Sequence, residues 1–466
     1  RPAVGRMRNG EEKELDVFSL SDSGDEVEPL FAEGGPAAAE RDSDGEDGLH
    51  FVAKDGGALQ KEGEQEVLSS ASRAFGNTFI SFVGAGILGL PYAFRRVGIV
   101  GGSAVLFVVS FLSYYAMMLI IKCRYSQNTI QLKSYGEVGH AALGVTGRLL
   151  VDISLVVSQA GFCVAYLIFI STNIHNIIPD IPPWAVTVIC LPALALLTWI
   201  RHLKHLAPFS ILADVVNVVG LTVVFINYFE AMADPRDAEG TLKSITVFET
   251  SEIAFFFGVA IYCYEGVGMV IPIESTMKEK EKFPFVLALT MVLVTAIYAA
   301  FGIFGHMAFG QGTHEIITIN LPPNVFNMLV KLCFCTGLYF TYPIMMFPVN
   351  QILEGMVPFL NGDFHWRKNV FRVCVVMVTG AVAVSVPNFS VFISLIGSSC
   401  CALLAFILPA VFHLTLCKDA SKMAKAVDIL LIVIGVVGAV LGTINAVNDL
   451  IAAIFPGGGE GGEGGE

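Results

Sequence analysis

The interpretation of this sequence depends on two glycine-rich stretches that interrupt its long apolar runs, Gly84-Ala85-Gly86-Ile87-Leu88-Gly89 and Gly266-Val267-Gly268-Met269-Val270-Ile271-Pro272. Pro91 follows the first stretch as Pro272 ends the second. The first stretch matches the pattern G-x-G-x-x-G of dinucleotide-binding proteins, but that pattern works only between a strand and a helix. Here the flanking residues are apolar over a length that predicts a membrane span.

The composition separates the chain into two regions at about residue 67. Residues 1–66 hold 18 acidic and 7 basic residues, whereas the other 400 residues hold 23 and 21. We interpret residues 1–66 as a disordered acidic tail, because so few apolar groups cannot offset the entropy of ordering. The whole chain is 54% hydrophobic and 15% charged, against about 25% charged for soluble globular proteins.

The region after residue 70 predicts an all-α membrane protein with eleven transmembrane helices, because each span needs about 20 mostly apolar residues. We place the spans near residues 74–94, 98–121, 149–178, 184–200, 207–229, 253–274, 284–309, 324–356, 370–387, 389–416 and 426–454. The predicted regions are 67–230 for helices 1–5, 231–417 for helices 6–10, 418–454 for helix 11, and 455–466 for a Gly/Glu-rich tail.

Lysine and arginine in the loops predict the orientation, since both concentrate on the cytoplasmic side. With a cytoplasmic N-terminus, the inner loops carry fifteen of them and the outer loops and helix ends carry four. We therefore expect residues 1–66 in the cytosol and residues 455–466 in a lumen or outside the cell.

The two glycine-rich stretches lie in the first and sixth predicted spans, at corresponding places in two halves of the chain. Paired interruptions of this kind indicate the site of a secondary transporter built from inverted repeats, with helices 1 and 6 broken. The competing interpretation is helix packing, because glycines let membrane helices approach closely.

A helix broken inside the bilayer frees amide and carbonyl groups that must line a wet cavity or bind a ligand. The freed N–H groups suit a carboxylate and the freed carbonyls suit an ammonium group. A zwitterionic amino acid satisfies both. We predict that the backbone of Gly84, Ala85, Gly86 and Ile87 binds the carboxylate, with Tyr264, Gly266 and Gly268 near the amino group and the side chain.

Glu265 stands directly beside the second stretch, and an ionisable group at membrane depth is usually functional. It is our candidate for proton coupling. The alternative is a permanently hydrogen-bonded strut that holds the unwound turn. We expect no cofactor other than the proton and no metal site. An enzyme is not expected, since no loop gathers a nucleophile, a base and metal ligands.

Three motifs resemble the amino acid/auxin permease family, in its branch of vacuolar and proton-coupled amino-acid transporters. They are Gly84 to Phe94, Tyr264-Glu-Gly-Val-Gly268 with Pro272-Ile-Glu274, and Ala308-Phe-Gly310 with Ile316-Ile-Thr-Ile-Asn-Leu-Pro322. The resemblance implies a LeuT-like fold of five-plus-five inverted repeats plus one helix, and places Glu265 at the acidic position of the family's sixth-span motif.

The resemblance also bears on the coupling ion. Sodium-coupled relatives usually place an Asn where this chain has Ile80, so protons are favoured over sodium. Some proton-coupled members have a His at the position that we align with Asn77, so the proton-carrying residue cannot be transferred from them.

We therefore predict a proton-coupled secondary transporter of small neutral amino acids. It would act by symport and alternating access, exporting them from an acidic lumen to the cytosol. A vacuolar or lysosomal membrane is favoured over the plasma membrane. The alternatives are an amino-acid sensor that signals through the tail, and a plasma-membrane auxin or sodium-coupled carrier. Expected partners are neutral amino acids and the lipid bilayer, and no nucleic acid.

The tail itself contains two features that could bind cytosolic proteins. Glu26-Val-Glu-Pro-Leu-Phe31 approximates an acidic sorting signal, and Ser23 and Ser43 each precede a Glu by three residues. A sorting adaptor or a kinase is therefore a possible partner of residues 1–66, and a solvated tail without partners is the alternative.

Overall fold

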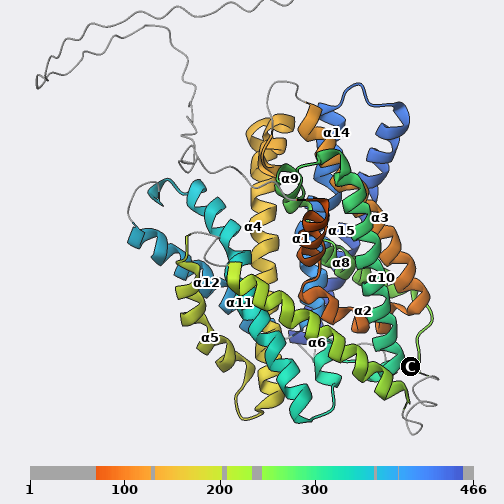
Figure 1. The fold of residues 1–466 in the computed structure, drawn as a ribbon, viewed down its shortest axis with the longest axis vertical. Coiled ribbons are helices and arrows are strands. Elements are labelled where there is room, and N and C mark those ends of the chain that lie inside the picture. Colours follow the sequence, from red (N-terminus) through yellow and green to blue (C-terminus); the bar gives the residue numbers. More distant parts are fainter. Residues whose placement is uncertain are drawn as a thin grey trace, which may run out of the picture. The chain divides into compact units, whose positions relative to one another are not determined.

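The computed structural model describes residues 70–126, 132–201, 207–233, 244–360, 365–386 and 388–454. Helices form its framework (Figure 1). In chain order they are α1 (Ala71–Phe82), α2 (Leu90–Val97), α3 (Ile99–Ser126), α4 (Tyr135–Ile177), α5 (Pro183–Thr198), α6 (Ala207–Ala233), α8 (Ile253–Cys263), α9 (Val267–Ser275), α10 (Phe283–Phe309), α11 (Val325–Met356), α12 (His365–Ser385), α13 (Phe389–Ile396), α14 (Leu408–Leu416) and α15 (Lys422–Ile454). The predicted tails 1–66 and 455–466 lie outside the described residues.

The described helices confirm an all-helical membrane protein. Nine of the described helical stretches are long and apolar enough to cross a bilayer, and α1 joins the segment Ala85–Val97 at a 44° bend to make a tenth. α5 is a shorter apolar helix of 16 residues. The count of eleven spans therefore stays a prediction that depends on whether α5 crosses.

The predicted span limits differ from the structure most at α4. This helix begins at Tyr135, although the sequence predicted a span only from residue 149. Leu143 and Gly144 interrupt it with non-helical backbone, and Gly144 has a φ of 64°, which favours glycine. Ser134 starts the helix, since its hydroxyl accepts a hydrogen bond from the Glu137 amide at 3.2 Å. The polar residues before 149 thus form a helix rather than a loop.

Both predicted interruptions are present. The 3-10 turn Ala85–Gly89 separates α1 from α2, and the segment 264–266 separates α8 from α9. The halves meet in opposite order: α1 contacts α9, and α2 contacts α8. Figure 1 shows α9 toward the upper part of the bundle and α2 toward the lower part. The two broken spans therefore run antiparallel, as an inverted repeat predicts.

The bundle has two ends that we name by one arginine each. The Arg96 end comprises the C-terminus of α2, residues 244–252, residues 310–324 and the start of α13. The Arg124 end comprises the start of α1, the C-termini of α3 and α9, and the start of α10. Each end brings together one half of each broken span.

A third irregular span carries α13 into α14. Residues Gly397–Cys401 and Leu403–Ile407 form π-helical turns there. Gly397 lies directly on α8: a Cβ added to it would come within 1.9 Å of the Gly258 carbonyl oxygen. This approach places α13 and the π-helical turns against the half of the broken span that leads to the second interruption.

Candidate functional site

The first break begins where α1 ends. Gly84 has extended backbone, with a φ of −115° and a ψ of −168°, and the chain resumes a helical course at Ala85. Ala85, Gly86 and Ile87 are buried. A Cβ at Gly86 would lie 2.8 Å from the Cys263 sulfur and 3.0 Å from the Tyr262 ring. Gly86 thus lets the first break lie directly against the end of α8.

The second break begins after Cys263. Gly266 is the residue before α9, and a Cβ on it would come within 2.6 Å of the Phe82 ring. Phe82 is the last residue of α1 and is buried. The two breaks therefore contact each other reciprocally, Gly86 against the end of α8 and Gly266 against the end of α1.

One hydroxyl from α10 joins the two ends. The Tyr298 hydroxyl donates to the Phe82 carbonyl oxygen and lies 3.2 Å from the Cys263 carbonyl oxygen. These are the final carbonyls of α1 and α8, which have no partner inside their own helices. Tyr298 is fully buried. The negative ends of both half-helices thus point at a single position.

The Tyr264 side chain is held by hydroxyl groups of two neighbouring helices. Its hydroxyl donates to the Thr295 hydroxyl at 2.8 Å, and Thr295 in turn lies 2.6 Å from the Ser110 hydroxyl of α3. The predicted role of Tyr264 near the amino group thus applies to its backbone, because its side chain is bonded within α10 and α3.

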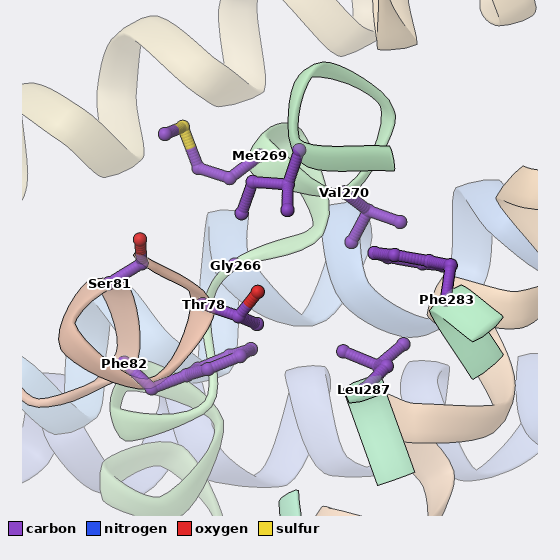
Figure 2. Close-up of a pocket in the computed structure, with 9 residues that line it drawn as sticks. Thr78, Ser81, Phe82, Gly266, Met269, Val270, Phe283 and Leu287 are labelled. Carbon is purple, nitrogen blue, oxygen red and sulfur yellow. The ribbon is translucent and has the colours of Figure 1, made fainter. Parts of the chain in front are cut away.

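A small pocket lies beside the second break (Figure 2). Figure 2 shows Thr78 and Phe82 extending from α1 toward Phe283 and Leu287 of α10. The pocket has room for about one water molecule. The lining residues are Thr78, Ser81, Phe82, Gly266, Met269, Val270, Ile273, Phe283 and Leu287.

Glu265 is buried, with 9% of its surface exposed. Its Oε2 atom has no hydrogen-bond partner among the described residues. A carboxylate oxygen without a partner is costly at this depth. The proton carrier and the hydrogen-bonded strut both stay predictions for this residue.

The structure brings the predicted residues together around one junction but not into one pocket. Gly266 lines the pocket, whereas Gly268 lies against Leu155 of α4. Gly84 has open space around it, since a Cβ there would meet nothing within 4 Å. Ala85 and Ile87 are buried beside Gly86 in the first break. Whether these positions bind a substrate remains a prediction.

Sequence reasoning missed most of the side chains at the junction. Ser81 and Phe82 follow Thr78 by three and four residues near the end of α1, so both lie on the same face as Thr78. That spacing next to a break was a usable signal. Tyr298 offered a weaker one: a tyrosine hydroxyl inside an apolar span requires a partner.

The two ends of the junction are fastened differently. At the Arg124 end, Arg124 of α3 pairs with Glu274 of α9, and the Tyr125 hydroxyl donates to the same carboxylate. At the Arg96 end, Arg96 pairs with Glu252 at 2.7 Å and with Asp449 at 2.6 Å. No group of three or more metal-ligating side chains occurs in the part of the chain that the structure describes.

A multi-pass helical bundle with two antiparallel broken spans that meet at freed carbonyls is a membrane transporter rather than an enzyme. The family described as transmembrane amino acid transporter protein matches residues 68–448. The chain belongs to this family, as the sequence motifs predicted.

Individual proteins are also similar to this chain. Amino acid transporter AVT3B of Arabidopsis thaliana is 40% identical over an alignment of 391 residues that covers 80% of this chain and 92% of that protein. Vacuolar amino acid transporter 4 of Saccharomyces cerevisiae is 28% identical over 74% of this chain and 53% of that protein. The solved structure of MhsT in complex with L-phenylalanine is similar with a TM-score of 0.49 and 13% identity, over 80% of this chain and 100% of that chain.

Proposed function

We propose that this protein is a proton-coupled transporter that carries small neutral amino acids from an acidic lumen to the cytosol by alternating access. The observation that carries the proposal is the junction of the two breaks at Tyr298. There the final carbonyls of α1 and α8 converge on one hydroxyl beside the pocket. An ammonium group, with three donors, can bind the same carbonyl oxygens.

The lining of the pocket favours a neutral substrate, and the pocket, which has room for about one water, must widen as the junction opens to admit it. Its lining consists of apolar side chains, one glycine and the hydroxyls of Thr78 and Ser81, and includes no charged side chain. A charged substrate side chain would be desolvated there without a partner, which is costly. The Phe82 ring against Gly266 also limits the room for a larger substrate.

Glu265 is the proposed proton carrier. Glu265 directly precedes Gly266, which lines the pocket, and its Oε2 atom has no hydrogen-bond partner among the described residues. A proton on this carboxyl removes the cost of a buried charge, so protonated Glu265 suits the closed junction. Loss of the proton to the cytosol would then accompany release of the substrate.

The direction follows from the predicted orientation together with the relatives. The yeast relative is named a vacuolar amino acid transporter, and vacuolar lumens are proton-rich. In the proposed orientation the Arg96 end faces the lumen and the Arg124 end faces the cytosol. A proton gradient then drives substrate toward the cytosol.

The test is amino-acid-driven proton flux in proteoliposomes with an imposed pH gradient, with alanine as the probe. We expect alanine to move protons, Glu265→Gln to abolish this flux, and Glu281→Gln to retain it. Glu281 is an exposed glutamate between α9 and α10, so it controls for the substitution itself. Transport that ignores the pH gradient but requires sodium would refute proton coupling, and normal flux in Glu265→Gln would exclude that residue.

A further inference from the structure

Residues 310–324 form a strap across the Arg96 end. Arg95 of α2 donates to the Thr313 carbonyl oxygen at 2.7 Å, and Thr318 donates to Asn173 of α4 at 2.6 Å. The strap turns at Gly310, whose φ of 51° favours glycine. These contacts tie the strap to α2, which directly follows the first break, and to α4.

Glu315 attaches the strap to α13. Its carboxylate accepts hydrogen bonds from the Asn388 side chain and from the Phe389 amide, the latter at 3.1 Å. The Ser390 hydroxyl donates to the Glu315 carbonyl oxygen at 2.9 Å. Glu315 therefore caps the first turn of α13, where amide groups have no partner inside the helix.

α13 in turn packs against the first break, so it connects the strap to that break. A Cβ added to Gly89, the last residue of the 3-10 turn, would meet Ile393 at 2.9 Å and Phe389 at 3.3 Å. The first turn of α13 is buried, with Phe389 1% exposed and Ser390 0%. If the strap released α13, the Arg96 side of the junction would lose this cover.

The charged and titratable groups that face Glu315 come from α2: Tyr92, Arg95 and Arg96. Both arginines already have partners, Arg95 at the Thr313 carbonyl and Arg96 at Glu252 and Asp449. α13 contributes only the neutral donors named above. The carboxylate thus has no ion pair among the described residues.

Burial raises the pKa of Glu315 from an ordinary value of 4.5 to about 7, even though the α13 donors and the two arginines favour the charged form. Glu315 lies outside the membrane-spanning helices. In an arrangement that exposes Glu315 to water, its pKa returns toward the ordinary value. Proton binding therefore favours the closed arrangement. The ratio of closed to open protein falls by up to about tenfold for each unit that the pH rises between those two pKa values.

We propose that Glu315 is a pH-responsive lock on the Arg96 end, a positioning residue whose proton uptake favours docking of the strap and α13 over the first break. Deprotonation favours release of the strap. The lock rests on the proposed function only in assigning the Arg96 end to the acidic side. It regulates closure and is separate from the coupling proton assigned to Glu265.

The first test measures closure directly, without transport. Hydrogen exchange of the α13 amides is followed in nanodiscs at pH 5 and pH 7.5 and corrected for the intrinsic pH dependence of exchange. We expect protection in the wild type to fall on going to the higher pH, and Glu315→Gln to make it independent of pH. Glu230→Gln, an exposed glutamate at the end of α6, is expected to behave as the wild type.

The second test measures alanine uptake in proteoliposomes while the pH on both sides is shifted together, so that the gradient stays constant. We expect wild-type uptake to change with pH mainly between 4.5 and about 7, where the closed fraction falls, and to level off above that range. Glu315→Gln should remove most of this change while retaining proton flux. If Glu315→Gln does not fold, Glu315→Asp retains the acid with a shorter reach, and its pH midpoint should shift downward.

Glu315→Gln, or a folded Glu315→Asp, with the wild-type pH dependence in both measurements would overturn the lock. Failure of alanine transport in every protein would instead count against the proposed function. The exchange measurement would still decide the lock in that case.

Discussion

The Arg96 end and the Arg124 end bring together equivalent halves of the two broken spans, but they are fastened by different physical means. At the Arg124 end one buried ion pair joins α9 to α3, with Arg124 4% exposed and Glu274 1% exposed. At the Arg96 end, Arg96 is 19% exposed and its partners Glu252 and Asp449 are 25% and 30% exposed. Loops and the strap supply the remaining contacts there.

The difference indicates which contacts can open. Partly exposed ion pairs and loop hydrogen bonds exchange with water at little cost, so the Arg96 end suits repeated opening. A buried ion pair resists separation, because each charge would be left without a partner. We therefore expect α9 to stay with α3, and opening at the Arg124 end to separate α1 from α9, along the pocket in Figure 2.

The largest effect is expected from breaking the buried pair. Glu274→Gln leaves the Arg124 guanidinium buried without its counter-charge, which costs about 3–5 kcal/mol of stability. The measurement is thermal unfolding in detergent, followed by intrinsic fluorescence. A double replacement by apolar residues, Arg124→Met with Glu274→Leu, is expected to recover much of the loss, since neither charge then remains. A Glu274→Gln protein as stable as the wild type would contradict the assignment of a fixed Arg124 end.

The breaks and most spans were predictable from the sequence because their signals are local. The breaks were predicted from the spacing of glycines within apolar runs, at Gly84, Gly86, Gly266 and Gly268, and from the cost of unpaired backbone groups in lipid. The family motifs were likewise confirmed by the match over residues 68–448. The helical stretch before the kink in α4 was not predicted, because the polar residues before 149 were assigned to a loop although Ser134 provides a helix cap.

The contacts that complete the site could not be predicted in this way. Tyr298 meets Phe82 across 216 residues and Glu315 meets Asn388 across 73 residues. Helices that are apolar on every side, as α8 is, carry no periodic signal that says which face turns toward the site. The sequence identified where backbone would be freed, and only the packing shows which side chains reach it.

An intermediate effect is expected at the pocket of the Arg124 end. Gly266→Ala places a Cβ 2.6 Å from the Phe82 ring, so the ring must move. Overpacking of this kind costs about 1–3 kcal/mol, and we expect reduced alanine uptake together with a lower unfolding temperature. The control is Gly76→Ala on α1, where a Cβ meets nothing within 4 Å. Phe82→Leu combined with Gly266→Ala should regain stability, and a Gly266→Ala protein that transports normally would show that the contact is not tight.

The smallest effect is expected at Arg96. Arg96→Gln removes both ion pairs of that side chain, yet exposed pairs contribute about 0–1 kcal/mol each. The stability loss should be about 1 kcal/mol or slightly more, since the guanidinium also lies 4.0 Å from the Phe255 ring centroid. Because salt screens exposed charges, the difference between Arg96→Gln and the wild type should shrink at high ionic strength, whereas the loss in Glu274→Gln should not. A loss of stability in Arg96→Gln as large as that in Glu274→Gln, and equally insensitive to salt, would mean that buried charges hold both ends. The expectation that the Arg96 end opens readily would then lose its physical basis.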